Sequence, residues 1–140
     1  MSATPGSALT DEDRQFIRDA FEQRWTRAIL ARNWPQALAL CAPDVVYMAA
    51  DQPVVTGHDA LRAFLDQFPP IAQFAQPLEA IDGQGTIAVG RGTFSATIEV
   101  AGTRIDNTGK VLCWFQKDGA ERWQVKGVCW NWDRPMASVV

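Results

Sequence analysis

Apolar residues recur at helical spacing in the first third of the chain. Between residues 11 and 31 they return every three or four positions and would form one apolar face of a long helix. Thr10 followed by three acidic residues is typical of a helix start, because the hydroxyl caps and the carboxylates favour the positive end of the dipole. Two shorter helices are predicted at residues 35–41 and 57–68, the first begun by Pro35 and the second ended by a Pro-Pro pair.

Further along, apolar and polar positions alternate, which is typical of half-buried strands. Strands are predicted at residues 44–50, 73–81, 86–100 and, in the stretch from Arg104 to Trp132, on both sides of a turn at residues 117–119. This stretch contains four of the six tryptophans. It therefore lines a core, a ligand pocket or a subunit interface, and the sequence leaves all three uses open.

Alternation assigns the side chains of the last strand to two faces. Val128, Trp130 and Trp132 are expected on one face, and Trp123 and Cys129 on the other. Either face could line a pocket while the opposite one meets a partner.

Three helices followed mainly by a meander of strands predict an α+β fold. We expect a strongly bent, mostly antiparallel sheet to wrap around the first helix and to leave a pocket between sheet and helices. Residues 1–10 are predicted to be a disordered tail, residues 11–134 a single domain and residues 135–140 a C-terminal tail. A chain of 140 residues is long enough to bury one core without covalent staples.

Composition excludes several classes of function. The net charge of −3 and the scattered basic residues argue against nucleic-acid binding, and no apolar run approaches the roughly 20 residues of a membrane span. The first residues lack the pattern of a secretory signal, so a cytoplasmic location is expected. The three cysteines and the single histidine show no metal-ligand spacing, so we expect neither a metal nor a cofactor. Cys113 and Cys129 are expected to be small buried residues instead of a disulfide.

Two ionisable residues stand out on the predicted helices. At 100° per residue, Arg24 projects into the apolar stripe of the first helix. It either reaches the rim or pairs with an acid, or it is a cation inside the pocket that binds a carboxylate or polarises a carbonyl. His58 lies in the first turn of a predicted helix, where a capping or solvent role is expected instead of catalysis.

Several short motifs, in this order, resemble the nuclear-transport-factor-2-like superfamily, in particular its bacterial SnoaL-like and ketosteroid-isomerase-like proteins. They are Ala-Pro-Asp-Val-Val at 42–46, Gly-His-Asp-Ala-Leu at 57–61, Gly109-Lys110, Trp123 and Trp130-Asn131. The resemblance covers residues 11–133 and implies a cystatin-like cone that encloses a pocket. That fold hosts isomerases, cyclases, hydrolases and non-catalytic binders, so it does not specify an activity.

The resemblance allows the isomerase chemistry to be checked by position. Ketosteroid isomerases need a carboxylate base late in the first strand, and a tyrosine with a neutral carboxylic acid at the enolate oxygen. In this chain those acid positions fall on Ala49 and near Val111, and the first helix has no tyrosine. The chain therefore lacks the ketosteroid isomerase carboxylate set, and that mechanism is not expected. SnoaL-like cyclases use an acid from a later strand as proton donor, which points to Asp106 as the catalytic candidate, together with Arg24. The alternative for Asp106 is a turn residue.

We therefore expect a protein that binds a small apolar or aromatic metabolite in an internal cavity, with cofactor-independent acid–base catalysis of the isomerase, cyclase or hydrolase type left open. The predicted ligand-binding residues are Trp25, Tyr47, Met48, Phe68, Trp130, Asn131 and Trp132. The alternative is a non-catalytic ligand-binding or protein-interaction module. In either case a homodimer through the outer sheet face is expected, anchored by Trp114 or Trp123.

Overall fold

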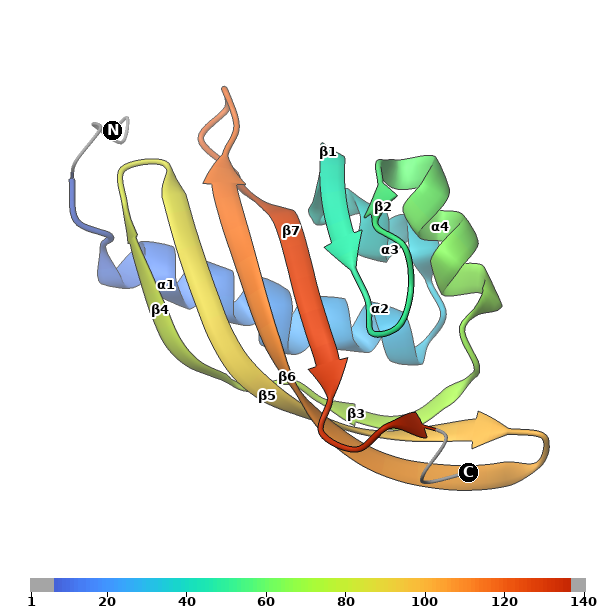
Figure 1. Ribbon diagram of the computed structural model, residues 1–140. Helices are drawn as coiled ribbons and strands as arrows, with labels where there is room; N and C mark the ends of the chain where they lie inside the picture. The colour runs from blue at the N-terminus through green and yellow to red at the C-terminus, as the bar shows by residue number, and fades with distance from the viewer. Residues whose placement is uncertain (1–6, 137–140) are drawn as a thin grey trace.

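The computed structural model describes residues 7–136, in which helices lie against one curved sheet (Figure 1). The longest helical segment crosses one face of the sheet, and the strands curve around it. It consists of three consecutive elements, α1 (Asp11–Arg18), the π-helical η1 (Asp19–Trp25) and α2 (Thr26–Leu30). The two shorter helices are α3 (Trp34–Ala39) and α4 (His58–Gln67). The predicted α+β fold with three helical regions is confirmed.

Thr10 begins the first helix, as its sequence predicts. The Thr10 hydroxyl accepts a hydrogen bond from the backbone N–H of Asp13, and the Asp13 carboxylate accepts one from the backbone N–H of Thr10, both over 3.0 Å. This reciprocal pair satisfies two N–H groups near the helix start that would otherwise lack partners.

The π-helical segment η1 changes the phase of the long helix. Its wider turns carry more residues than α-turns, so residues beyond it no longer follow 100° spacing. Trp25 takes a buried position, whereas Arg24 is exposed. Arg24 pairs with Asp19 over 3.3 Å and lies above the Phe16 ring. The expectation that Arg24 projects into the apolar stripe is therefore wrong. The alternative, that Arg24 pairs with an acid, agrees with the structure.

Seven strands form a single sheet with the order β2-β1-β7-β6-β5-β3, and β4 also pairs with β5. The β1–β7 pair is parallel and the other pairs are antiparallel, so the mostly antiparallel prediction is confirmed. The strands are β1 (Cys41–Met48), β2 (Val55–Thr56), β3 (Ile71–Ala75), β4 (Leu78–Gln84), β5 (Ile87–Val100), β6 (Thr103–Lys117) and β7 (Trp123–Trp132).

The strand predicted at residues 73–81 is in fact two strands, β3 and β4, separated by Gln76 and Pro77. Both pair with β5, β3 opposite its second half and β4 opposite its first. Pro77 has no N–H to donate to a ladder, which favours a break at this point. The Pro77 carbonyl approaches Gly92 of β5 so closely that a Cβ atom there would collide with it.

A β-bulge in β7 changes which tryptophans face the core. Trp114 of β6 lies opposite Gly127, but the next pair is Phe115 with Val125, so one residue of β7 is extra. Trp123 consequently shares the inner face with Trp130, and the prediction that it lies on the opposite face is wrong. Its indole N–H donates to Asp13 of the helix over 3.0 Å, so Trp123 is not free to anchor an outer interface.

The two cysteines of the β6–β7 hairpin project from opposite faces. Cys113 is buried and lies opposite Val128, whereas Cys129 is half-exposed and lies opposite Leu112. Both are free thiols, as predicted, but only Cys113 is fully buried. Inner-facing and outer-facing side chains therefore alternate regularly in this part of both strands.

The described residues of both predicted tails contact the rest of the domain. Leu9 is buried, Ala8 forms a β-bridge with Gln84, and the Ser7 carbonyl accepts a hydrogen bond from Gly85, so disorder is wrong for residues 7–10. Met136 packs against the core. Residues 1–6 and 137–140 of these tails lie outside the described part of the chain. No helix within residues 7–136 is long and apolar enough to cross a membrane.

Candidate functional site

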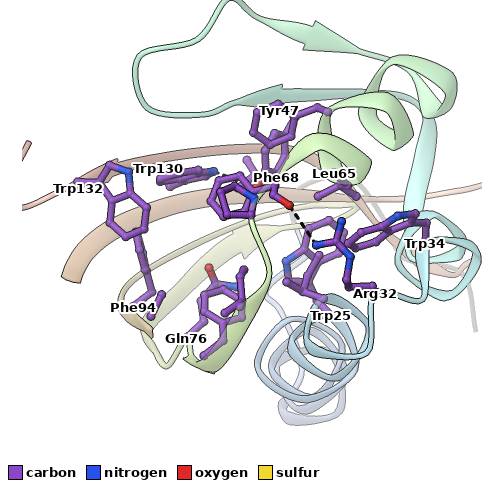
Figure 2. Close-up of a pocket in the computed structure, with 17 residues that line it drawn as sticks. Trp25, Arg32, Trp34, Tyr47, Leu65, Phe68, Gln76, Phe94, Trp130 and Trp132 are labelled. Carbon is purple, nitrogen blue, oxygen red and sulfur yellow. Dashed lines mark hydrogen bonds between the residues drawn. The ribbon is translucent and has the colours of Figure 1, made fainter. Parts of the chain in front are cut away.

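An apolar pocket lies between the concave face of the sheet, the end of the long helix and α4 (Figure 2). The free volume of the pocket is about 50 Å³. Nine of its side chains are aromatic, and Pro69 adds a tenth ring. The lining residues are Trp25, Ile29, Arg32, Trp34, Tyr47, Phe64, Leu65, Phe68, Pro69, Ile71, Phe74, Gln76, Phe94, Ala96, Val128, Trp130 and Trp132.

The aromatic rings of this pocket contact one another in an unbroken series. Tyr47 links the helix to α4, with ring centroids 6.4 Å from Trp25 and 5.4 Å from Phe64. Trp130 lies 6.2 Å from Phe68 and 5.1 Å from Trp132 on the sheet side. Most of these pairs are tilted or edge-to-face, the geometries that the ring quadrupoles favour. The wall is therefore a continuous, apolar surface of packed rings.

Tyr47 and Trp130 add a hydrogen bond to this wall. The Trp130 indole N–H donates to the Tyr47 hydroxyl oxygen over 2.9 Å, and both side chains are buried. Burial raises the pKa of the Tyr47 hydroxyl well above its ordinary value, and the Trp130 hydrogen bond opposes this only in part. Tyr47 thus keeps its proton, and its O–H remains available as a donor.

Arg32 lies at the rim and fixes the chain that follows α4. Its guanidinium donates to the backbone carbonyls of Phe68 and Asp66, each over 3.0 Å, and stacks over the Trp34 ring (Figure 2). Arg32 has a φ of 52°, the left-handed conformation that commonly ends a helix, and it directly follows the last turn of the long helix. Trp34 donates to the Asp66 carboxylate over 3.3 Å, which ties α3 to the same segment.

Five of the seven predicted ligand-binding residues line the pocket. These are Trp25, Tyr47, Phe68, Trp130 and Trp132. Met48 and Asn131 do not, because each is the strand neighbour of a pocket residue and so points to the other face.

The two predicted catalytic residues are not in the pocket and do not meet. Arg24 is on the exposed side of the helix, and Asp106 is on the outer face of β6, because Ile105 and Asn107 on either side of it are buried. Asp106 accepts a hydrogen bond from Thr97 over 2.6 Å at a separate polar hollow that also includes Arg134. The expectation that these two residues share the cavity is wrong.

Several residues that line the pocket were not among the predicted ligand-binding residues. Phe64 and Phe94 occupy apolar positions of a predicted helix and strand, so periodicity marked them as buried without separating pocket from core. Arg32 carries no signal beyond its place at a helix end. Gln76 was placed inside a continuous strand, where alternation puts it on the same face as Phe74, but nothing in the pattern marked a glutamine as a pocket residue.

His58 and the thiols show no catalytic or metal arrangement. The His58 ring nitrogen Nε2 lies 3.1 Å from the backbone carbonyls of Cys41 and Ala42, so it holds the start of α4 against β1, in line with a structural role. Within residues 7–136, no group of three His, Cys, Asp or Glu side chains could hold a metal ion.

Comparisons with known proteins agree with this geometry. The SnoaL-like domain family matches residues 23–123. A ketosteroid isomerase-like protein from Erwinia carotovora atroseptica SCRI1043 superposes with a TM-score of 0.80 at 17% identity, over 91% of this chain and 100% of that chain. An NTF2-like superfamily protein from Salmonella enterica serovar Typhimurium LT2 gives a TM-score of 0.76 at 17% identity, over 91% and 95%.

An NTF2-like protein with a cystatin-like fold from Novosphingobium aromaticivorans gives a TM-score of 0.72 at 18% identity, over 91% of this chain and 86% of that chain. A search of curated proteins gave no match. At such identities the structural matches establish the fold alone, whereas the family match covers most of the chain. The chain belongs to the SnoaL-like domain family and has the cystatin-like fold of the NTF2-like superfamily.

Proposed function

We propose that the protein binds a small apolar or aromatic molecule in the pocket between the helices and the sheet. The observation that carries the proposal is the unbroken aromatic wall from Trp25 to Trp132, because concave sites lined by aromatic side chains with few polar groups are typical of ligand pockets. The free volume of about 50 Å³ limits the ligand to about one ring, and lining side chains have to move to admit it, because a cavity that holds benzene measures roughly 150 Å³.

The lining chemistry favours binding over acid–base catalysis. Among the described lining residues, Arg32 is the single charged side chain, and none is a carboxylate, a histidine or a cysteine. Tyr47 holds its proton too firmly to act as a base near neutral pH. The pocket thus offers donors and apolar surface but no group to abstract a proton.

A titration with α-methylstyrene, a flat hydrocarbon with one ring, tests this proposal. We expect quenching of tryptophan fluorescence and NMR shifts of the methyl groups of Ile29, Leu65 and Val128, with the outer-face methyl groups of Leu112 unchanged. Ala96→Leu partly fills the pocket and should weaken binding, whereas Ala75→Leu on the exposed side of β3 should not. Shifts confined to Leu112, or equal binding by both variants, would contradict the proposal.

A second candidate function, self-association through the outer sheet face, is favoured by an exposed apolar patch. It consists of Ile87, Val89 and Leu112, with Trp114 lying opposite Val89 in the ladder. The charges at its margins are paired within the chain, Arg91 with Glu79 and Lys110 with Asp133, so they do not leave a single uncompensated sign that would repel a second copy.

Light scattering tests this second proposal. We expect a dimer whose dissociation constant rises on Leu112→Glu, because the substitution puts a charge in the patch. Val54→Glu introduces the same charge at an exposed apolar residue outside the patch and should leave the dimer intact. A wild-type monomer at high concentration would rule out the dimer while leaving the pocket proposal in place.

A further inference from the structure

Gln76 carries an amide nitrogen that has no partner in the part of the chain that the structure describes. The side chain is only 6% exposed, it lines the pocket, and its Nε2 makes no hydrogen bond within residues 7–136. A buried donor without an acceptor costs about 1–3 kcal/mol, and such groups are rare in native proteins. An unsatisfied amide on a pocket wall therefore points to a partner that enters from outside the protein.

The chain holds Gln76 in this position. Pro77 restricts the residue before it to extended conformations, and the Pro77 carbonyl is lodged against Gly92 of β5. On the other side of the break, both backbone groups of Leu78 are bonded to the helix, the N–H to Glu22 over 2.6 Å and the carbonyl to Arg18 over 2.7 Å. The amide is consequently presented on a backbone fixed from two directions.

Water is a poor partner for this amide. A buried water needs two to four polar partners, about three being typical. The other polar side chains of the lining are already engaged: Arg32 with two backbone carbonyls, Trp34 with Asp66, and Trp130 with Tyr47. Of the described lining side chains, the Tyr47 O–H and the remaining N–H groups of Arg32 still have donor capacity, and a further donor does not satisfy the first.

We propose that Gln76 is the specificity-determining residue of the pocket and donates through Nε2 to a neutral carbonyl oxygen of an otherwise apolar ligand. This inference rests on the proposed binding function and adds the chemical class of the ligand. In Figure 2, Gln76 and Tyr47 lie well apart, so the two donors address different points of a ligand. A ligand with a second acceptor oxygen would use both.

Three small probes of similar size test the inference. Acetophenone presents a carbonyl oxygen, α-methylstyrene replaces that oxygen by a CH2 group, and benzoate carries a negative charge. Each is titrated by tryptophan fluorescence into the wild type, Gln76→Leu and the matched control Gln73→Leu, an exposed glutamine of β3 outside the pocket. Gln76→Met, which keeps the length of the side chain, repeats the test if the leucine variant does not fold. The thermal midpoint of each free protein is measured as well.

The expected result is that acetophenone binds the wild type about tenfold more tightly than α-methylstyrene, since one buried hydrogen bond is worth about this factor. Gln76→Leu should abolish the difference while α-methylstyrene binds as before, and Gln73→Leu should keep it. The midpoint of free Gln76→Leu should stay constant or rise, because the variant removes an unsatisfied buried donor.

Other outcomes overturn the inference in distinguishable ways. Equal binding of acetophenone and α-methylstyrene to the wild type would refute the carbonyl preference and leave the apolar pocket standing. Tightest binding by benzoate, lost in Arg32→Ala, would assign the polar contact to Arg32. A lower midpoint for Gln76→Leu together with weaker binding of both neutral probes would show a structural role. Binding of none of the three probes would refute the proposed function itself.

Discussion

The indole of Trp130 donates its N–H to the hydroxyl oxygen of Tyr47 over 2.9 Å, and this bond joins β7 to β1 inside the aromatic wall. The two strands also pair in parallel, with Tyr47 opposite Val128. The bond therefore couples the pocket surface to the register of the single parallel pair in the sheet.

Tyr47→Phe should lower the free energy of unfolding by about 1–2 kcal/mol, because it leaves the buried Trp130 N–H without an acceptor. Urea unfolding followed by fluorescence measures the change. A double-mutant cycle with Trp130→Phe should give a coupling energy of about 1 kcal/mol. Additive effects of the two substitutions would show that the bond does not stabilise the fold.

Asp13 should make stability depend on acid pH. Burial raises the pKa of its carboxyl, but hydrogen bonds from the Trp123 indole, from Thr10 and from Lys117 outweigh burial and lower the pKa to about 2. The carboxyl is 17% exposed, so screening by solvent is limited. Since the folded pKa lies below the unfolded one, the charge stabilises the fold above about pH 4. The stabilisation is lost as the pH falls to about 2.

Asp13→Asn should therefore unfold about 2 kcal/mol more easily than the wild type at pH 7, and the difference should vanish near pH 2. Urea unfolding at a series of pH values tests this. Asp11→Asn removes an exposed carboxylate of the same helical turn and serves as the control. A difference between Asp13→Asn and wild type that is equal at pH 7 and pH 2 would contradict the assigned role of the charge.

Arg32→Ala should loosen the segment between α4 and β3. It removes two hydrogen bonds to the carbonyls of Phe68 and Asp66, so hydrogen exchange at the Phe68 amide should accelerate about fivefold to tenfold. Arg32→Lys should behave similarly, because a single ammonium cannot reproduce the fork of the guanidinium. Arg27→Ala, an exposed arginine of α2, is the control and should leave this exchange rate unchanged.

The three thiols should differ in reactivity. Burial raises the pKa values of Cys41 and Cys113 to about 12, so almost no thiolate forms at pH 8, whereas Cys129 is half-exposed. We expect iodoacetamide to modify one thiol quickly in the folded protein and all three in urea. Cys129→Ser should remove the fast phase. Rapid modification of two thiols in the folded wild type would contradict the burial of Cys41 or of Cys113.

If the outer face forms a dimer, the modification of Cys129 should also slow as protein concentration rises, because Cys129 lies opposite Leu112 of the patch. Leu112→Glu should restore the fast rate. A rate independent of concentration in a protein shown to be dimeric would place the interface elsewhere.

Periodicity predicted the order of the elements because each helix and strand buries one regular face. Tyr47 and Trp130, which were predicted to contact a ligand, do line the pocket, and both lie within even stretches of alternation. Periodicity failed where backbone geometry is irregular. The π-helical turns displace Arg24, and the bulge beside Gly127 moves Trp123 to the inner face. These irregularities depend on pairing with distant segments, which a local pattern does not contain.

The candidate chemistry was the less predictable part. Asp106 was predicted to be catalytic because it is an isolated acid in its stretch. In β6, however, side chains alternate between the two faces, and Asp106 lies on the face away from the pocket. Gln76 drew none, because a glutamine in a strand pattern is ordinary, and its significance arises only from the missing acceptor around its amide. The polar character of a site thus depends on partners that lie far away in the chain.

The contacts between the first helix and β4 bear on how the molecule behaves at high concentration. Arg14 donates to the carbonyl of Ile81, while Arg18 and Glu22 engage both backbone groups of Leu78. An open strand edge is a template on which another chain can add and start a fibril. Here helix side chains already bond to backbone groups of β4, so these groups cannot pair with a strand of another chain. Arg18 and Glu22, which hold the backbone next to Gln76, therefore also reduce the tendency of the sheet to aggregate.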